Sequence, residues 1–255
     1  MNNLKIAVIQ SDIIWEKPSE NLKRYTGMIK VSGNPDLVIL PEMFATGFTM
    51  EPEQVKEGMD GESVKWMKNV SSNHNCAVTG SLIIEENGKI FNRCLWVTPD
   101  GTVEYYDKKH LFTMNGEDHH YSPGNKKLIV NYKGWRICPL ICYDLRFPVW
   151  SRNCEDYDLL IYMANWPSSR HQAWKTLLPA RAVENQSWCI GVNRVGQDGS
   201  GFTYKGDSVL VDPKGYTEFY GDSEQIRIFE ISYQQLIDFR KKFPVLNDRD
   251  EFILT

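Results

Sequence analysis

Short apolar segments alternate with amphipathic segments along most of the chain. Apolar runs bounded by turn residues predict strands, and apolar residues at helical spacing, as at Val64, Met67 and Val70, predict helices. The predicted strands are residues 4–10, 36–40, 76–84, 90–98, 102–108, 127–132, 135–141, 159–163, 187–193, 208–212 and 225–231. The predicted helices are residues 19–30, 62–73, 171–186 and 233–242. Ser19 is expected to cap the first of these helices.

The order of these elements predicts the fold class. Tight turns at residues 99–101 and 133–134 join neighbouring strands into hairpins, whereas the earlier strands alternate with helices. This mixture predicts an α/β protein in which helices cover mixed sheets. No repeat or linker divides the sequence, so one domain is expected over residues 1–255. Residues 243–255 have apolar positions without a clear period, and are either a frayed end or a tail that packs against another subunit.

Composition and charge exclude several classes of protein. The chain has 29 lysines and arginines against 33 aspartates and glutamates, which offers no basic surface for nucleic acid. Its longest apolar runs are far shorter than the roughly 20 residues of a membrane-spanning helix, and the apolar start at residues 4–9 is too short for a signal peptide. The 6 cysteines lie singly and irregularly, as in proteins of a reducing compartment. We therefore expect a cytoplasmic protein with neither nucleic acid nor a membrane as partner.

Common catalytic and metal-binding motifs are absent. The sequence contains no nucleophile elbow, no phosphate-binding loop and no zinc-protease motif. Glu117-Asp118-His119-His120 is the only cluster that suggests a metal, but adjacent residues rarely converge on one ion, and no cysteine pair has ligand spacing. We interpret this cluster as a polar loop and expect no metal and no cofactor.

A carboxylate follows the buried strand at residues 36–40. Pro41 cannot continue the hydrogen-bond ladder, so Glu42 is expected at the carboxyl end of the strand, where α/β sheets place their ligand sites. On local grounds alone, a capping or surface glutamate is the more frequent explanation of this pattern.

Two adjacent lysines end the strand predicted at residues 102–108. The alternation of side chains along a strand places Tyr106 and Lys108 on one face and Lys109 on the other. One lysine can therefore face the interior while its neighbour is solvated. A charged strand end is again the simpler local interpretation.

A thiol stands at the end of the strand predicted at residues 135–141. Cys142 follows this strand, and Pro148 with Trp150 opens a helix a few residues later. Backbone N–H groups at such a place favour the thiolate form of a cysteine. The other cysteines are expected to be inert buried side chains.

These three segments, taken together and in this order, are more specific than any one of them. Pro-Glu-Met-Phe (residues 41–44), Tyr-Asp-Lys-Lys-His-Leu-Phe (106–112) and Cys-Tyr-Asp-Leu-Arg-Phe-Pro (142–148) resemble the carbon–nitrogen hydrolases of the nitrilase superfamily. The resemblance spans essentially the whole chain, including Asn-Trp-Pro (165–167) and Arg-Ala-Val-Glu-Asn-Gln (181–186). Within that superfamily the sequence is most similar to the bacterial ω-amidase branch.

The resemblance implies a four-layer αββα sandwich, usually a homodimer, with a Glu–Lys–Cys triad. Glu42 is then the general base, Lys108 the catalytic lysine and Cys142 the nucleophile. The family's lysine lies two residues before the histidine of His-Leu-Phe, which selects Lys108. The backbone N–H of Tyr143 is expected to bind the oxyanion together with Lys108, and Glu117 is expected to be a second carboxylate near the triad.

The resemblance also implies a small amide substrate that carries a carboxylate at its far end, such as 2-oxoglutaramate or 2-oxosuccinamate. Hydrolysis through a cysteine thioester would give the acid and ammonia. Arg146 can present a planar fork to the carboxylate of the substrate; the alternative is a structural salt bridge, for instance to Asp144. Trp166 either walls the pocket or packs in the core.

Other functions share much of this pattern. A nitrilase or an N-carbamoyl amino acid amidase would use the same triad, and a panel of substrates separates these activities. A non-catalytic relative that only binds a ligand would release no ammonia, and the presence of all three triad residues argues against it.

Pro179 lies inside the helix predicted at residues 171–186. A proline at this position predicts a kink in the helix near Arg181 and Glu184.

Overall fold

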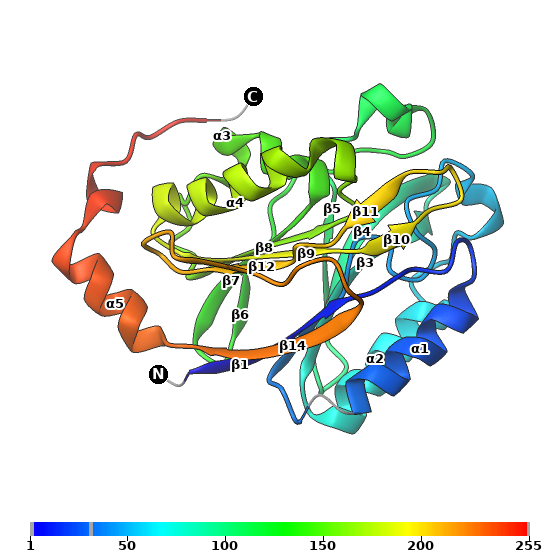
Figure 1. The fold of residues 1–255 in the computed structure, drawn as a ribbon, viewed down its shortest axis with the longest axis horizontal. Helices are drawn as coiled ribbons and strands as arrows, with labels where there is room; N and C mark the ends of the chain where they lie inside the picture. Colours follow the sequence, from blue (N-terminus) through cyan, green and yellow to red (C-terminus); the bar gives the residue numbers. More distant parts are fainter. Residues whose placement is uncertain (1–2, 31–32, 254–255) are drawn as a thin grey trace.

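The computed structural model describes residues 3–30 and 33–253, which form two six-stranded sheets packed face to face (Figure 1). The first sheet has the order β14 (Gln225–Ile231), β1 (Leu4–Gln10), β2 (Leu37–Ile39), β3 (Ala77–Glu86), β4 (Lys89–Val97) and β5 (Val103–Asp107). The second has the order β13 (Thr217–Phe219), β12 (Val209–Val211), β9 (Trp188–Asn193), β8 (Leu159–Ala164), β7 (Trp135–Ile141) and β6 (Val130–Tyr132).

Helices cover the outer faces of both sheets. On the first sheet lie α1 (Pro18–Lys30) and α2 (Glu62–His74), side by side. On the second lie α4 (His171–Asn185) and the short α3 (Pro148–Ser151), while α5 (Tyr233–Lys242) follows β14 beyond the layers (Figure 1). The layers are therefore helix, sheet, sheet and helix, which confirms the αββα sandwich. Within the described residues, no helix is long and apolar enough to cross a membrane.

The burial of both faces of the first sheet explains why its strands are apolar at nearly every position. In β1, Ile6 and Val8 pack towards the second sheet, whereas Ala7 and Ile9 pack towards α1 and α2. A half-solvated strand would alternate apolar and polar residues, but a strand covered on both sides does not.

The last strand completes the first sheet. β14 pairs antiparallel with β1, from Leu4 opposite Ile231 to Gln10 opposite Gln225. On its other side β1 pairs in parallel with β2. Strands from the two ends of the described chain therefore lie next to each other, as Figure 1 shows.

Every predicted strand and helix is present in the described part of the chain, with its ends moved by a few residues. The prediction that Ser19 caps the first helix is wrong. The helix begins at Pro18, whose fixed φ and missing N–H suit a first turn. The hydroxyl of Ser19 instead donates to the carboxylate of Glu62 at 3.1 Å. Three short strands were not predicted, namely β10 (Val195–Gln197), β11 (Thr203–Lys205) and β13.

Pro179 lies inside α4, which is assigned as a single helix from His171 to Asn185. The buried Arg181 just after it donates to the carbonyl of Leu145 at 2.6 Å and to Glu184 at 3.0 Å. The missing backbone donor therefore does not interrupt the helix or displace Arg181.

Chain segments that leave four strands supply the residues of interest. Glu42 follows β2, Lys108 follows β5, Cys142 follows β7 and Asn165 follows β8. The ligand sites of α/β proteins commonly lie where strands reach their carboxyl ends.

Candidate active site

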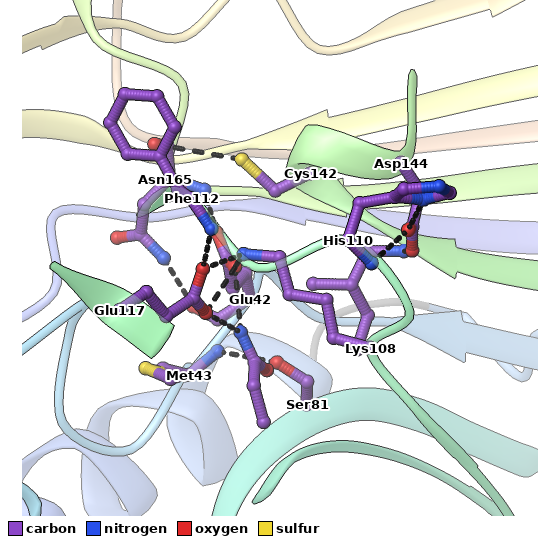
Figure 2. A network of polar contacts seen from close by, with 12 residues as sticks. Glu42, Met43, Ser81, Lys108, His110, Phe112, Glu117, Cys142, Asp144 and Asn165 are labelled. Atoms are coloured by element: carbon purple, nitrogen blue, oxygen red, sulfur yellow. Dashed lines mark hydrogen bonds and ion pairs between the residues drawn. The ribbon is translucent and has the colours of Figure 1, made fainter. Parts of the chain in front are cut away.

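Glu42 lies fully buried at the centre of a polar network (Figure 2). One carboxylate oxygen accepts hydrogen bonds from Lys108 Nζ at 3.0 Å and from Asn92 Nδ2 at 2.8 Å. The other accepts the backbone N–H of Asn165 at 2.8 Å. This glutamate is therefore neither a cap nor a surface residue, and its position after a strand matches the functional interpretation.

Lys108 also lies in the interior, as the alternation of side chains predicts. Lys108 and Tyr106 are each 1% exposed, whereas Lys109 is half-buried with its Nζ 5.6 Å from the centre of the Trp150 ring. Burial alone would lower the pKa of Lys108, but the carboxylates of Glu117 and Glu42 outweigh it and raise the pKa above its usual value. The side chain therefore carries a permanent positive charge.

Glu117 is the second carboxylate of this network. Lys108 Nζ donates to its two oxygens at 3.0 and 2.9 Å, and Asn92 Nδ2 donates to it at 3.3 Å. Burial and the charge of Glu42 raise the pKa of Glu117, although Lys108 opposes them. The interpretation of residues 117–120 as a polar loop is wrong for Glu117, which is fully buried. No group in the described residues has the ligands to hold a metal ion.

Cys142 begins a short 3-10 helix, Cys142–Arg146, directly after β7. Its φ of 40° lies in the left-handed region, which is costly for a side chain other than glycine and is concentrated at functional sites. The thiol donates to the carbonyl of Asn165 at 3.9 Å and is partly exposed. Met43, next to Glu42, has a φ of 43°. Left-handed backbone is thus found both in the segment that carries Glu42 and in the segment that carries Cys142.

The expectation that local backbone favours the thiolate of Cys142 is wrong for the free protein. Burial, followed by the charge of Glu42 and its hydrogen bond, raises the pKa of Cys142 well above its usual value, and Lys108 only partly opposes them. The sulfur therefore holds its proton at neutral pH, and its reaction as a nucleophile requires a base.

Asp144 connects the loop of Lys108 with the turn of Cys142. Its fully buried carboxylate accepts hydrogen bonds from Tyr106 Oη at 2.7 Å, the backbone N–H of Ile141 at 3.0 Å, and His110 through both its backbone N–H at 3.0 Å and its ring Nδ1 at 2.8 Å. Figure 2 shows His110 and Asp144 beside Lys108. The salt bridge considered between Asp144 and Arg146 is therefore not formed.

A pocket of about 180 Å³ opens onto Glu42, Lys108 and Cys142. Tyr143, Arg146 and Trp166 also line it, and the guanidinium carbon of Arg146 lies 5.0 Å from the centre of the Trp166 ring. The other lining residues are Phe48, Met50, Phe112, Met114, Asn115, Asn165, Pro167, Arg170, Asp198, Ser200, Phe202 and Tyr204. The structure thus brings together every site residue proposed from the sequence. Glu117 does not line the pocket itself but contacts Lys108, which does.

A family model for carbon–nitrogen hydrolases matches residues 5–241. The chain belongs to this family. It is 44% identical to the omega-amidase YafV of Escherichia coli (strain K12) over 256 residues, with 100% of each chain covered. It is 33% identical to the 2-oxoglutaramate amidase of Bacillus subtilis (strain 168), with 95% of this chain and 96% of that protein covered. The crystal structure of XC1258 from Xanthomonas campestris, a CN-hydrolase superfamily protein, matches with a TM-score of 0.98 at 43% identity over 100% of both chains.

Sequence reasoning missed several residues that shape the site of this carbon–nitrogen hydrolase. Asn92 donates to both carboxylates, and the available signal was a polar residue within the predicted strand at residues 90–98. Arg170 and the hairpin residues 198–204 carry no local pattern that points to a pocket, because loops from distant parts of the chain bring them there.

Replacing Glu42 by glutamine is expected to lower the pKa of Cys142. The carboxylate charge that raises this pKa is removed, and a neighbouring charge shifts a pKa by about one to three units. The thiolate then forms at lower pH, so the pH profile of Cys142 alkylation by iodoacetamide moves downward although amide hydrolysis is lost. Mass spectrometry of the alkylated peptide at several pH values measures this shift. Glu218→Gln, at an exposed site on β13, is the matched control; an unchanged or upward-shifted profile in Glu42→Gln would contradict the expectation.

Proposed function

We propose that this carbon–nitrogen hydrolase is an ω-amidase. It hydrolyses the terminal amide of dicarboxylic acid monoamides, such as 2-oxoglutaramate and 2-oxosuccinamate, to the acid and ammonia. The observation that carries the proposal is the presence of a guanidinium group without an ionic partner among the described residues, Arg146, in the same small pocket as Cys142. The names of the omega-amidase and 2-oxoglutaramate amidase relatives support it.

In the first half of the proposed reaction, Glu42 takes the proton of Cys142 as the sulfur attacks the amide carbon. The high pKa of the thiol favours this coupled transfer over a preformed thiolate. The carbon–nitrogen bond then breaks, and Glu42 gives the proton to the leaving nitrogen. Ammonia departs, and the acyl group remains on the sulfur as a thioester.

The negative oxygen of the tetrahedral intermediate needs donors that are in place before the reaction. Lys108 supplies a fixed positive charge in a buried setting, and the backbone N–H of Tyr143 is proposed as the second donor. Glu117 accepts two hydrogen bonds from the ammonium group of Lys108 and so orients it.

In the second half of the reaction, water replaces ammonia in the pocket. Glu42 takes a proton from this water, which attacks the thioester carbon, and the proton then passes to the leaving sulfur. The products are the free acid and the restored thiol. No described residue other than the Glu42–Lys108–Cys142 set is needed to move a proton.

Arg146 is proposed to bind the distal carboxylate of the substrate. Its guanidinium plane rests on the Trp166 ring, which leaves the N–H fork free for a two-pronged contact. Arg146→Ala is expected to lower kcat/KM for acid-bearing amides, because the carboxylate then lies unpaired in the pocket. The fall should correspond to a loss of about 2 to 5 kcal/mol of transition-state stabilisation. Arg146→Lys should restore only part of this loss.

A neutral amide of similar size is the control for this prediction. The ratio of kcat/KM for the acid-bearing amide to kcat/KM for the neutral amide should be smaller in Arg146→Ala than in the unmodified enzyme. A fall by the same factor for both substrates would show that Arg146 has only a structural role.

The proposed function is tested by measuring ammonia release from 2-oxoglutaramate and from glutamine, side by side. We expect much faster release from 2-oxoglutaramate. Release from neither substrate, with rapid release from a nitrile or an N-carbamoyl amino acid, would refute the ω-amidase assignment and leave the family membership intact.

We also propose that the enzyme is a single-domain homodimer of the cytoplasm and that the tail after α5 packs against the second subunit. Phe243, Phe252 and Ile253 in this tail are exposed apolar side chains, which supports such a contact; residues 254–255 lie outside the described part. The mass of the particle in solution, measured by light scattering, tests the dimer.

A further inference from the structure

Arg170 is a second guanidinium group in the pocket, and like Arg146 it has no polar partner for its side chain among residues 3–30 and 33–253. Every other arginine of the chain donates to a carboxylate, a side-chain amide oxygen or a backbone carbonyl within the described residues. The two guanidinium groups without such a partner therefore lie in the same pocket as Cys142.

Both guanidinium groups are held by aromatic rings instead. Arg146 lies over Trp166, and the guanidinium carbon of Arg170 lies 4.7 Å from the centre of the Phe112 ring. The indole N–H of Trp166 also donates to the backbone carbonyl of Arg170 at 2.8 Å, which links the ring that supports Arg146 to the backbone of Arg170. Contact with a ring face orients a guanidinium group without using its N–H donors.

The carboxylates of the pocket are already engaged. Asp198 accepts the backbone N–H groups of Ser200 and Phe202, each at 2.9 Å, and the hydroxyl of Tyr204 at 2.6 Å. Glu42 is held by Lys108 and its neighbours, as described above. The N–H donors of the two guanidinium groups are therefore available to an acidic substrate in the pocket.

One guanidinium fork can hold both oxygens of a carboxylate in a bidentate contact, so the second guanidinium group is available to another acceptor of the same substrate. We propose that Arg170 binds the substrate together with Arg146 and that the pair recognises a 2-oxo acid, with Arg146 on the carboxylate and Arg170 on the neighbouring 2-oxo oxygen. This inference rests on the proposed function and deepens it, since it assigns the recognition of the oxo group to a residue outside the motifs described in the sequence analysis.

The test compares two substrates that differ only in the oxo group, 2-oxoglutaramate and glutaramate. Arg170→Gln is expected to lower kcat/KM for 2-oxoglutaramate by about 10- to 100-fold, the scale of a lost hydrogen bond to a charged group, and to leave glutaramate within about 3-fold. Arg146→Gln should lower both. Arg227→Gln is the matched control, because Arg227 is an exposed arginine on β14 that also lies over an aromatic ring, that of Tyr220, away from the pocket.

Inhibition by the product acids provides a measurement that does not depend on turnover. The unmodified enzyme should bind 2-oxoglutarate more tightly than glutarate, and Arg170→Gln should lose this preference, whereas Arg227→Gln should keep it. Arg170→Lys should recover part of the preference. Because Arg170 is only half-buried, its replacement does not create a cavity in the core. The unfolding temperature of each variant should therefore be close to that of the unmodified enzyme.

Two results would overturn the inference: an equal fall for 2-oxoglutaramate and glutaramate in Arg170→Gln, or no fall for either. Failure of the proposed function is recognised separately and first, on the unmodified enzyme. If the unmodified enzyme hydrolyses no acid-bearing amide, the ω-amidase proposal is refuted. If it is active but Arg170→Gln does not change the preference for 2-oxoglutaramate over glutaramate, only the role of Arg170 is refuted.

Discussion

Cys142→Ala is expected to abolish amide hydrolysis, with a fall in kcat of about 10⁴-fold or more. The variant loses the sulfur atom proposed to form the thioester, and no other described cysteine lines the pocket. Four of the others are buried, and burial raises the pKa of Cys76 to about 11 and that of Cys94 to about 12. Ammonia release measures the loss, and mass spectrometry of the acid-quenched enzyme should find the acyl group only on the Cys142 peptide of the unmodified protein.

The prediction that the other cysteines are buried is wrong for Cys154, which is exposed and provides the matched control for the nucleophile. Cys154→Ser should keep nearly full activity, and 2-oxoglutarate should protect Cys142, but not Cys154, from iodoacetamide. In the native protein Cys142 should be labelled fastest. The assignment is wrong if loss of another cysteine stops turnover, or if the acyl group is found elsewhere.

Lys108→Met is expected to lower kcat by about 10³-fold or more. The change removes the proposed oxyanion donor, and the loss of one such donor alone costs about 10²- to 10³-fold. It also leaves the buried carboxylates of Glu42 and Glu117 without their cation. Lys109→Met should change kcat by only a few-fold, since that side chain lies against Trp150 outside the network.

The stability of Lys108→Met has to be separated from its catalysis, because an unpaired buried charge costs about 3 to 5 kcal/mol. Circular dichroism and thermal unfolding report the fraction folded, and Lys108→Met/Glu117→Gln removes one of the stranded charges. This double variant should regain stability but not activity. Equal losses of activity in folded Lys108→Met and Lys109→Met would show that both lysines serve the site.

The sequence pattern predicted the layers well because strands buried on both faces leave long apolar runs, as in β1 and β8. It missed β10, β11 and β13, which are three-residue strands formed by pairing across loops and carry no period of their own. The pattern placed Glu42, Lys108 and Cys142 at strand ends. Only the resemblance to a family predicted that these three residues form one catalytic site. The high pKa of the thiol comes from burial and then from the charge of Glu42, which is distant in sequence, so it could not be read from the residues around Cys142.

The pairing of β1 with β14 determines when the first sheet can close during synthesis. Leu4 finds its partner only when Ile231 has left the ribosome, so until then β1 presents an edge of free N–H and C=O groups. Pairings between residues so far apart are slow to form, since a long loop must close first. A nascent chain of this enzyme therefore remains open to edge-to-edge association through most of its translation.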